Sequence, residues 1–298
     1  MGLSAGGVAV LPPDTLLVRR ALDFLAGGPA TATAFVAAVC QVSGAPTLVA
    51  DRLALDLLGG RPQFRRLPDG RWALAGATAP PAGDGDRLDR VSFVVVDVET
   101  TGGRPEGGDR VTEIAAVLVE GLRVVEPPLV DTLVNPERSI PSFITSITNI
   151  TSAMVATAPR FRDVSAQVTD ALRGRVFVAH NASFDWRFVS AEVTRATGAR
   201  LQGRQLCTVR LARKLLPHLP RRSLDHVAHY YGVPNAARHR AAGDAFATAH
   251  VLVRLLRDAA ERGMETWSAL DTLLSAGTAT SRRRRSALPR PVDRGEGA

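Results

Sequence analysis

Cysteine and long apolar runs are scarce in this 298-residue chain. Its two cysteines, Cys40 and Cys207, do not have the spacing of a metal site, and a reducing cytoplasm is the simplest compartment for such a chain. No apolar run reaches the length that spans a bilayer. The N-terminus also lacks the basic region and apolar stretch of a signal peptide. We therefore expect a cytoplasmic protein that does not contact a membrane.

Lysine is almost absent: Lys214 is the only one, although lysine and arginine together number 37. The net charge of +8 and the pI of about 10.9 suit a polyanionic partner such as nucleic acid. A preference for arginine can also reflect genome composition, and part of the excess comes from the arginine run at residues 282–285. Charge alone therefore supports a nucleic-acid partner only weakly.

Composition divides the chain into four parts. Hydrophobic residues make up 45% of it, which is enough for a well-buried core. We expect a small domain over 1–75, a linker rich in Gly, Pro and Asp over 76–90, and a larger domain over 91–262. The remaining residues, 263–298, form a C-terminal extension that is predicted to be mostly a disordered basic tail.

Apolar spacing in the small domain predicts three helices followed by two short strands. The first helix begins near residue 16 with Asp14 as its N-cap, and the Pro-Asp-Gly sequence at 68–70 is a good turn between the strands. The other predicted helices cover 31–42 and 47–58, and the strands cover 64–67 and 72–74. This order is typical of a winged helix-turn-helix domain.

A winged helix-turn-helix domain that binds DNA places basic or amide side chains of one helix in the groove. The third predicted helix instead offers Asp51, Arg52 and Asp56. The predicted wing is more suitable because it is rich in arginine. Its arginines are Arg61, Arg65, Arg66 and Arg71. DNA binding by this domain is therefore one hypothesis, and a packing or partner-docking role is the favoured alternative.

The larger domain opens with a nearly continuous run of apolar, β-branched residues over 91–98, the pattern of a strand buried on both faces. Further strands are predicted at 111–119, within 124–134 and at 175–179, and helices at 161–172 and 183–197. Strands first, then alternating helix and strand, predict an α/β fold with a mixed sheet flanked by helices.

Asp97 and Glu99 stand at the end of the first buried strand, where residues i and i+2 point to the same face. Their mutual repulsion and desolvation would be costly without a counter-charge. A hard divalent cation removes that cost, because Mg²⁺ prefers carboxylate oxygens. The alternative is a pair of solvated acids at a strand end.

Two later segments contribute groups suited to the same chemistry. Asp185 follows a buried strand and opens a helix, where the alternative role is an ordinary acid stabilised by the helix dipole. Asp244 falls in the first turn of a helix predicted over 245–256, and His239 lies in the loop before it. Histidine suits proton transfer near neutral pH, although a lone histidine is often a surface or core residue.

In order and context, these pieces resemble the three motifs of the DEDDh 3′–5′ exonucleases. The matching segments are Asp-Val-Glu-Thr-Thr-Gly at 97–102, Asn-Ala-Ser-Phe-Asp at 181–185 and His-Arg-Ala-Ala-Gly-Asp at 239–244. The connecting sequence Thr-Glu-Ile-Ala-Ala-Val at 112–117 is also similar to the second strand of the family. The resemblance covers roughly residues 91–257 and is strongest to the proofreading (epsilon) subunits of bacterial replicative DNA polymerase. It implies a ribonuclease H-like fold.

One spacing selects a subclass of that family. A sister group has tyrosine four residues before the last aspartate, where this chain has Arg240. His239 stands five residues before that aspartate, which is the arrangement of the histidine-type enzymes. Asn149 stands where the family often has glycine, but asparagine tolerates the left-handed backbone of such a turn.

The resemblance implies hydrolysis of phosphodiester bonds with two divalent metal ions, Mg²⁺ or Mn²⁺. Asp97 would bridge both ions, and Glu99 and Asp244 would complete the site of the ion that carries the attacking water. Asp185 would serve the other ion. His239 would take the proton of the attacking water.

The resemblance also implies substrate contacts at the 3′ end of single-stranded DNA, with nucleoside 5′-monophosphates as products. Thr100, Thr101 and Gly102 would approach the terminal nucleotide through backbone groups. Asn181 would help to hold the strand or the loop, and Phe184 would pack in the core.

Several alternatives stay open. An RNA-trimming member of the family is one, although oligoribonuclease-like members tend to carry methionine where this chain has Thr100. Others are a non-catalytic nucleic-acid-binding module and an adaptor that docks a DNA polymerase. Clamp-binding peptides commonly begin with glutamine, and none follows Gln205. Replication proofreading with a polymerase partner and stand-alone DNA repair are therefore both possible roles.

Overall fold

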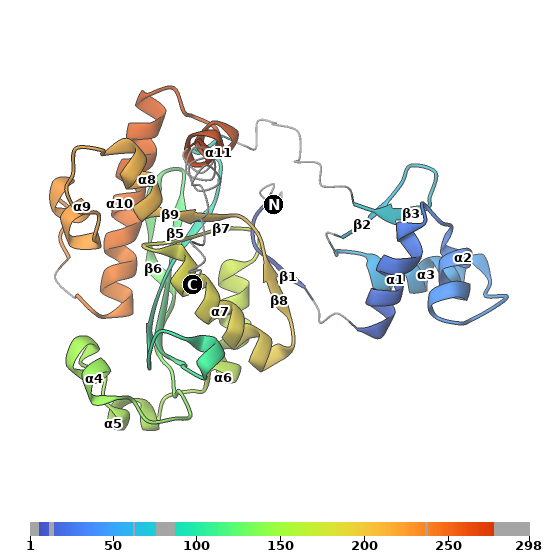
Figure 1. Ribbon diagram of the computed structural model, residues 1–298, viewed down its shortest axis with the longest axis horizontal. Coiled ribbons are helices and arrows are strands. Elements are labelled where there is room, and N and C mark those ends of the chain that lie inside the picture. The colour runs from blue at the N-terminus through green and yellow to red at the C-terminus, as the bar shows by residue number, and fades with distance from the viewer. Residues whose placement is uncertain (1–5, 12–14, 62, 76–86, 236–237, 277–298) are drawn as a thin grey trace, which may run out of the picture. The chain divides into compact units, whose positions relative to one another are not determined.

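The computed structural model describes residues 6–11, 15–61, 63–75, 87–235 and 238–276. The chain divides into two compact units, whose helices and strands are labelled in Figure 1. The smaller unit comprises Val10–Pro81 and Gly198–Arg200. The larger unit comprises Met1–Ala9, Ala82–Thr197 and Leu201–Ala298.

The smaller unit consists of three helices followed by a two-stranded antiparallel sheet. Its elements are α1 (Leu16–Ala26), α2 (Ala32–Val39), α3 (Thr47–Leu58), β2 (Phe64–Arg66) and β3 (Trp72–Leu74). Buried side chains such as Val18, Phe35 and Trp72 form its apolar core. The element order agrees with the sequence analysis, and the winged helix-turn-helix assignment stays a prediction.

Two helix ends of this unit differ from those expected. Thr15 caps α1, because its Oγ1 accepts a hydrogen bond from the Val18 amide at 3.3 Å. Asp14, the expected cap, lies outside the described residues. Helix α2 ends at Val39 instead of residue 42, because Gln41 adopts a φ of 60°, which is incompatible with a right-handed helix.

A five-stranded mixed sheet forms the centre of the larger unit, in the order β6-β5-β4-β7-β9. Its strands are β4 (Phe93–Thr100), β5 (Val111–Glu120), β6 (Arg123–Leu133), β7 (Val176–Ala179) and β9 (Gln205–Cys207). The first three are antiparallel neighbours, whereas β7 pairs in parallel with β4 and with β9. The central strands β4, β5 and β7 are almost wholly buried, as their apolar sequences predict.

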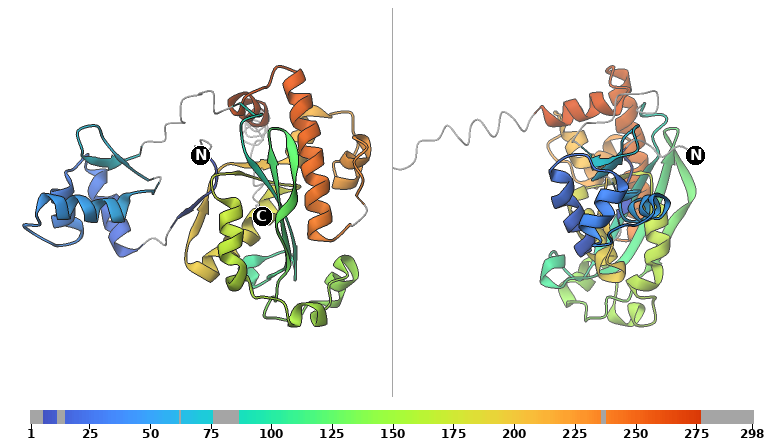
Figure 2. Two further views of the ribbon diagram at one scale, coloured as in Figure 1. Left: turned by 180° about the vertical axis from the view of Figure 1, so that it is seen from behind. Right: turned by 90° about the vertical axis from the view of Figure 1, so that its right-hand side faces the viewer.

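Helices cover both faces of this sheet, as Figure 1 and the left view of Figure 2 show. On one side lie α8 (Thr208–Leu215), α9 (Leu224–Tyr230) and the long α10 (Ala241–Glu261). On the other lie α6 (Phe161–Leu172) and α7 (Ala182–Thr197). Phe93 and Val95 of β4 belong to the same buried cluster as Leu252 of α10. Because side chains alternate along a strand, Asp97 and Glu99 also face the α10 side.

The remaining described elements are short. They are β1 (Ala9–Leu11) and β8 (Arg200–Gln202), which pair with each other, the 3₁₀ helix η2 (Pro105–Gly107), α4 (Ser142–Thr148), α5 (Ser152–Ala156) and α11 (Trp267–Ser275). None of the helices in the described part of the chain is long and apolar enough to cross a membrane.

The larger unit includes residues on both sides of the predicted span 91–262. The Val8 amide donates a hydrogen bond to the Arg175 carbonyl at 2.8 Å, and the Gly174 amide donates one to the Val8 carbonyl at 2.9 Å. At the other end, Trp267 and Leu270 of α11 join the main buried cluster. The predicted disordered tail from residue 277, and most of the predicted linker, lie outside the described residues.

Candidate active site

Three carboxylates converge at one end of the sheet. Asp97 and Glu99 come from β4, and Asp244 comes from the first turn of α10. One oxygen of each lies within 4.8 Å of the others, an arrangement that could hold a metal ion. The pairing of β4 with β5 shifts in register between Glu99 and Thr100, immediately after the second acid. The local alternation of β4 and the start of α10 thus bring together groups that lie far apart in the sequence.

Asp185 and Asp244 are each held by hydrogen bonds. Asp185 is 3% exposed in the first turn of α7, and its Oδ1 accepts a hydrogen bond from the Val98 amide at 3.2 Å. Asp244 accepts one from Asn235 Nδ2 and one from the His239 amide, both at 2.9 Å. Asp185 is outside the group of three converging carboxylates, so its role as a metal ligand stays a prediction.

The carboxylates strongly perturb one another in the protein without an ion. Burial raises the pKa of Asp97 well above its ordinary value, and the charges of Asp185, Glu99 and Asp244 raise it further. Burial, followed by the charge of Asp244, raises the pKa of Glu99 to about 7. Burial also raises the pKa of Asp185 to about 8. These shifts show that the site concentrates negative charge that the protein alone does not neutralise.

The residues present fit a divalent ion. The ligands are hard carboxylate oxygens, which Mg²⁺ and Mn²⁺ prefer. A bound cation would also supply counter-charge to Asp97 and Glu99, whose pKa values are raised above their ordinary values. The identity and number of the ions are part of the proposal below.

Acidification in EDTA is expected to stabilise the protein. Glu99 and Asp185 have folded-state pKa values of about 7 and about 8, above the ordinary 4.5 and 3.8, so the folded state binds more protons than the unfolded chain in this range. The free energy of unfolding should therefore rise by about 3 kcal/mol or more between pH 8 and pH 6, with about 1 kcal/mol from Glu99 and about 2 kcal/mol from Asp185, at 1.36 kcal/mol per pKa unit. Thermal melting in EDTA at both pH values measures this change. Saturating Mg²⁺ should remove most of it, and an unchanged or lower melting temperature at pH 6 in EDTA would contradict the prediction.

His239 lies on the exposed loop before α10, in a left-handed conformation with a φ of 58°. Its amide bond to Asp244 ties this loop to one of the converging carboxylates. The next residue, Arg240, makes an ion pair with Glu113, a β5 carboxylate that is 2% exposed. This pair was not predicted from the sequence. Its one sign there is Glu113, a single carboxylate inside the apolar run at 111–119.

The loop after Glu99 is fixed by its own side chains. Thr100 Oγ1 donates a hydrogen bond to the Gly102 carbonyl at 2.6 Å, and Thr101 Oγ1 accepts one from the Arg110 amide at 3.0 Å. Both threonine side chains are buried. They therefore shape the loop, and contact of its backbone groups with a substrate stays a prediction.

Substituting Gly102 is expected to distort this loop. A Cβ at this position would collide with the carboxylate of Asp109, which anchors the loop by accepting a hydrogen bond from the Arg104 amide at 3.0 Å. If the site carries the nuclease activity that the motifs predict, Gly102→Ala should lower its kcat/KM by about 10-fold or more, because small misplacements at a site have large effects. Gly103→Ala is the matched control, since a Cβ there meets nothing within 4 Å. Equal activity of the two variants would show that the loop geometry is unimportant.

The second motif segment forms the turn into α7. Asn181 has a φ of 84°, and its carbonyl accepts a hydrogen bond from the Phe184 amide at 2.9 Å. This favours a role in holding the loop, while contact with substrate stays a prediction. Phe184 was expected in the core, but it is only half-buried and packs against Phe188 with ring centroids 4.9 Å apart. Phe184 lies on the same side of α7 as Phe188 but in the first turn, so the end of the helix leaves it partly exposed.

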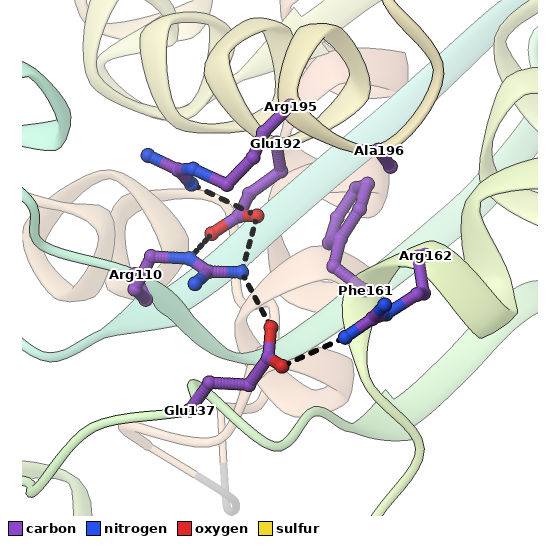
Figure 3. A pocket seen from close by; sticks show the side chains of 7 residues that line it. All are labelled: Arg110, Glu137, Phe161, Arg162, Glu192, Arg195 and Ala196. Atoms are coloured by element: carbon purple, nitrogen blue, oxygen red, sulfur yellow. Dashed lines mark hydrogen bonds and ion pairs between the residues drawn. The ribbon is translucent and has the colours of Figure 1, made fainter.

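A separate pocket of about 260 Å³ lies on the α6–α7 side of the larger unit and contains none of the predicted site residues. Figure 3 shows that its charged side chains are paired with one another. Arg110 contacts both Glu192 and Glu137, Arg195 contacts Glu192, and Arg162 contacts Glu137. This ion-pair network connects the start of β5 with α6 and α7.

Comparisons with known proteins show the family of the larger unit. The exonuclease family model matches residues 94–252. A DNA polymerase III subunit epsilon-like protein of Rhodobacter capsulatus is 42% identical over 187 residues, which are 62% of this chain and 26% of that protein. The 3′-5′ exonuclease DinG of Bacillus subtilis is 35% identical over 169 residues, which are 57% of this chain and 18% of that protein. Escherichia coli exonuclease I in complex with a dT13 oligonucleotide matches with a TM-score of 0.50 and 17% identity, covering 57% of this chain and 42% of that chain.

The sheet order and the converging acids define a ribonuclease H-like α/β domain with a candidate metal site, which confirms the predicted fold class. With more than half of its residues matched by the family model, the chain belongs to the exonuclease family. It spans only about a quarter of the length of its Rhodobacter relative.

Proposed function

We propose that this protein is a 3′–5′ exonuclease that hydrolyses single-stranded DNA to nucleoside 5′-monophosphates, in DNA repair or replication proofreading. The observation that carries the proposal is the convergence of Asp97, Glu99 and Asp244 within 4.8 Å in a chain of the exonuclease family. The similarity to the Bacillus protein named a 3′-5′ exonuclease supports the direction of attack.

In the proposed mechanism, Asp97, Glu99, Asp185 and Asp244 would hold two divalent ions. When bound, these ions would activate the attacking water and stabilise the leaving 3′ oxygen. His239 lies on an exposed loop whose amide is bonded to Asp244, and it would accept the proton of that water. The buried threonines after Glu99 hold the loop rigid, so that its backbone groups can position the terminal nucleotide.

A single-stranded substrate is supported by an exposed apolar face near the site. Phe143 and Ile147 lie four residues apart on α4, so they share one face, and they are 61% and 49% exposed. Figure 1 and the left view of Figure 2 show α4 at the same end of the larger unit as the N-terminal end of α10. Unpaired bases stack on aromatic side chains such as Phe143 without regard to sequence, and Ile147 extends the apolar surface beside it. The net charge of +8 favours the phosphate backbone of either DNA or RNA.

The smaller unit does not by itself indicate DNA binding. The charged side chains of α3 pair with one another or with the wing: Arg52 contacts Asp56 at 3.2 Å, and Asp51 contacts Arg66 at 3.3 Å. The same helix exposes Leu48 to 84%. These features favour a packing or protein-docking role over recognition in a DNA groove. The epsilon-like relative supports a DNA polymerase as one candidate partner, and stand-alone repair is the alternative.

The test is degradation of 5′-labelled single-stranded DNA and RNA of one sequence, with Mg²⁺, with Mn²⁺ and with EDTA. We expect a ladder that shortens from the 3′ end of the DNA and that EDTA abolishes. Faster shortening of RNA would assign the chain to the RNA-trimming exonucleases. Intact substrates in both metals, with protein shown to be folded by circular dichroism, would contradict the nuclease proposal and favour a nucleic-acid-binding module.

A further inference from the structure

Glu113 is a buried carboxylate that the proposed mechanism does not use. It lies directly opposite Glu99 in the antiparallel pairing of β4 with β5 and is 2% exposed. Like charges directly opposite each other destabilise a sheet, and a buried carboxylate without a partner costs still more. The rest of β5 from Ile114 to Val119 is apolar and buried. A charge at this position therefore requires a specific compensating group.

Arg240 supplies that group. Its Nε donates to the two oxygens of Glu113 at 3.0 and 3.2 Å, and its Nη2 donates to Oε1 at 2.6 Å. The amide of Ala241 donates to Oε2 at 2.8 Å. Both oxygens of Glu113 are thus occupied by donors from the start of α10.

The contacts join the two halves of the site. Glu113 is the strand neighbour of Glu99, whereas Arg240 stands between His239 and the first residue of α10. The amide of Asp244 also donates to the Arg240 carbonyl at 3.1 Å. Moving Arg240 would therefore move both His239 and Asp244 relative to Glu99.

We propose that Glu113 and Arg240 form a positioning pair that sets the separation of the Glu99 and Asp244 carboxylates and so determines how tightly the divalent ion binds. The inference rests on the proposed function of this site. Stability alone does not explain the pair, because the Arg240 side chain is 45% exposed, and replacing a buried carboxylate and its partner by apolar residues is often neutral or stabilising. Geometry explains the pair better. The planar guanidinium of Arg240 contacts Glu113 through two nitrogens, which lysine cannot do, and this contact fixes the start of α10 to the strand beside Glu99.

The test is calorimetric titration of Mn²⁺ into Glu113→Gln, without nucleic acid. Glutamine keeps the shape but loses the charge and turns one acceptor into a donor. We expect Mn²⁺ binding to weaken by about 10- to 100-fold, as is usual for groups that orient metal ligands. Exonuclease activity should fall at low Mn²⁺ and recover in part at high Mn²⁺, so that the effect lies mainly in the metal dependence.

Glu192→Gln is the matched control. Glu192 is also 2% exposed, is paired with Arg110 at 2.6 Å and accepts a hydrogen bond from the Val111 amide at 3.3 Å, but it belongs to the separate network of Figure 3. Its substitution should lower the melting temperature and leave Mn²⁺ affinity unchanged. Equal weakening of Mn²⁺ binding in the two glutamine variants would reduce Glu113 to a structural role and overturn the inference.

Arg240→Lys tests the pair from its exposed side, where a loss of folding is less of a risk. It should also weaken Mn²⁺ binding, because lysine keeps the charge but not the two-nitrogen contact. Wild-type Mn²⁺ affinity in this variant or in Glu113→Gln would overturn the inference. Wild-type protein that binds Mn²⁺ but degrades no nucleic acid would instead contradict the proposed function and leave the metal measurement valid.

Discussion

Replacing Asp97 with Asn is expected to slow the 3′-end shortening of single-stranded DNA by at least about 10³-fold while raising the melting temperature in EDTA. The rate should fall because Asp97 would hold a metal ion that stabilises charge in the transition state by several kcal/mol. Each 1.36 kcal/mol lost corresponds to a factor of ten in rate. The gain in stability follows because burial, and then the charges of Asp185 and Glu99, raise the pKa of Asp97. A neutral amide of the same shape removes that repulsion.

Asp170→Asn is the control for this experiment, because Asp170 lies on α6 with its side chain 76% exposed. Neither the rate nor the melting temperature of this variant should change appreciably. The two readouts of Asp97→Asn test separate statements. Retention of more than a tenth of the wild-type rate would show that Asp97 is not a metal ligand. A lower melting temperature in EDTA would show that the site does not carry uncompensated charge.

Local apolar patterning predicted the strands β4 to β7 and the helices α6, α7 and α10 of the larger domain, but not its shorter elements. The helix expected at 161–172 is α6 with the same bounds, and the strand expected at 111–119 is β5 to within one residue. Patterns of this kind report burial directly, because the period of apolar residues is the period of the element. Strand pairing is a non-local property. Nothing in the residues of β4 specifies that it lies between β5 and β7, so the sheet order required the structure.

The same distinction applies to the site. Asp97 and Glu99 could be predicted because their position at the end of a buried strand is a local feature, and the order of the three motifs supplied the other groups. Glu113 was visible as a charge in an apolar strand, but its partner lies 127 residues further along the chain. The orienting contacts of a site are therefore harder to predict than its reacting groups, since each depends on where two distant segments meet.

Replacing His239 with Asn is expected to lower kcat by about 10²- to 10⁴-fold, the usual contribution of a general base, with KM and Mn²⁺ affinity nearly unchanged. Asparagine is the informative substitution because His239 has a φ of 58°, and asparagine tolerates this left-handed conformation. The amide that donates to Asp244 is retained, so the carboxylate keeps its hydrogen bond. The loss should therefore be confined to proton transfer.

Two measurements separate this role from a structural one. Imidazole added to the His239→Asn protein should restore part of the lost rate, because a free base can take the place of the missing side chain. The control is His250→Asn, an exposed position further along α10, which should keep the wild-type rate and show no response to imidazole. If His239→Asn instead lost Mn²⁺ affinity and imidazole had no effect, the histidine would act by holding Asp244 and the general base would have to be sought elsewhere in the site.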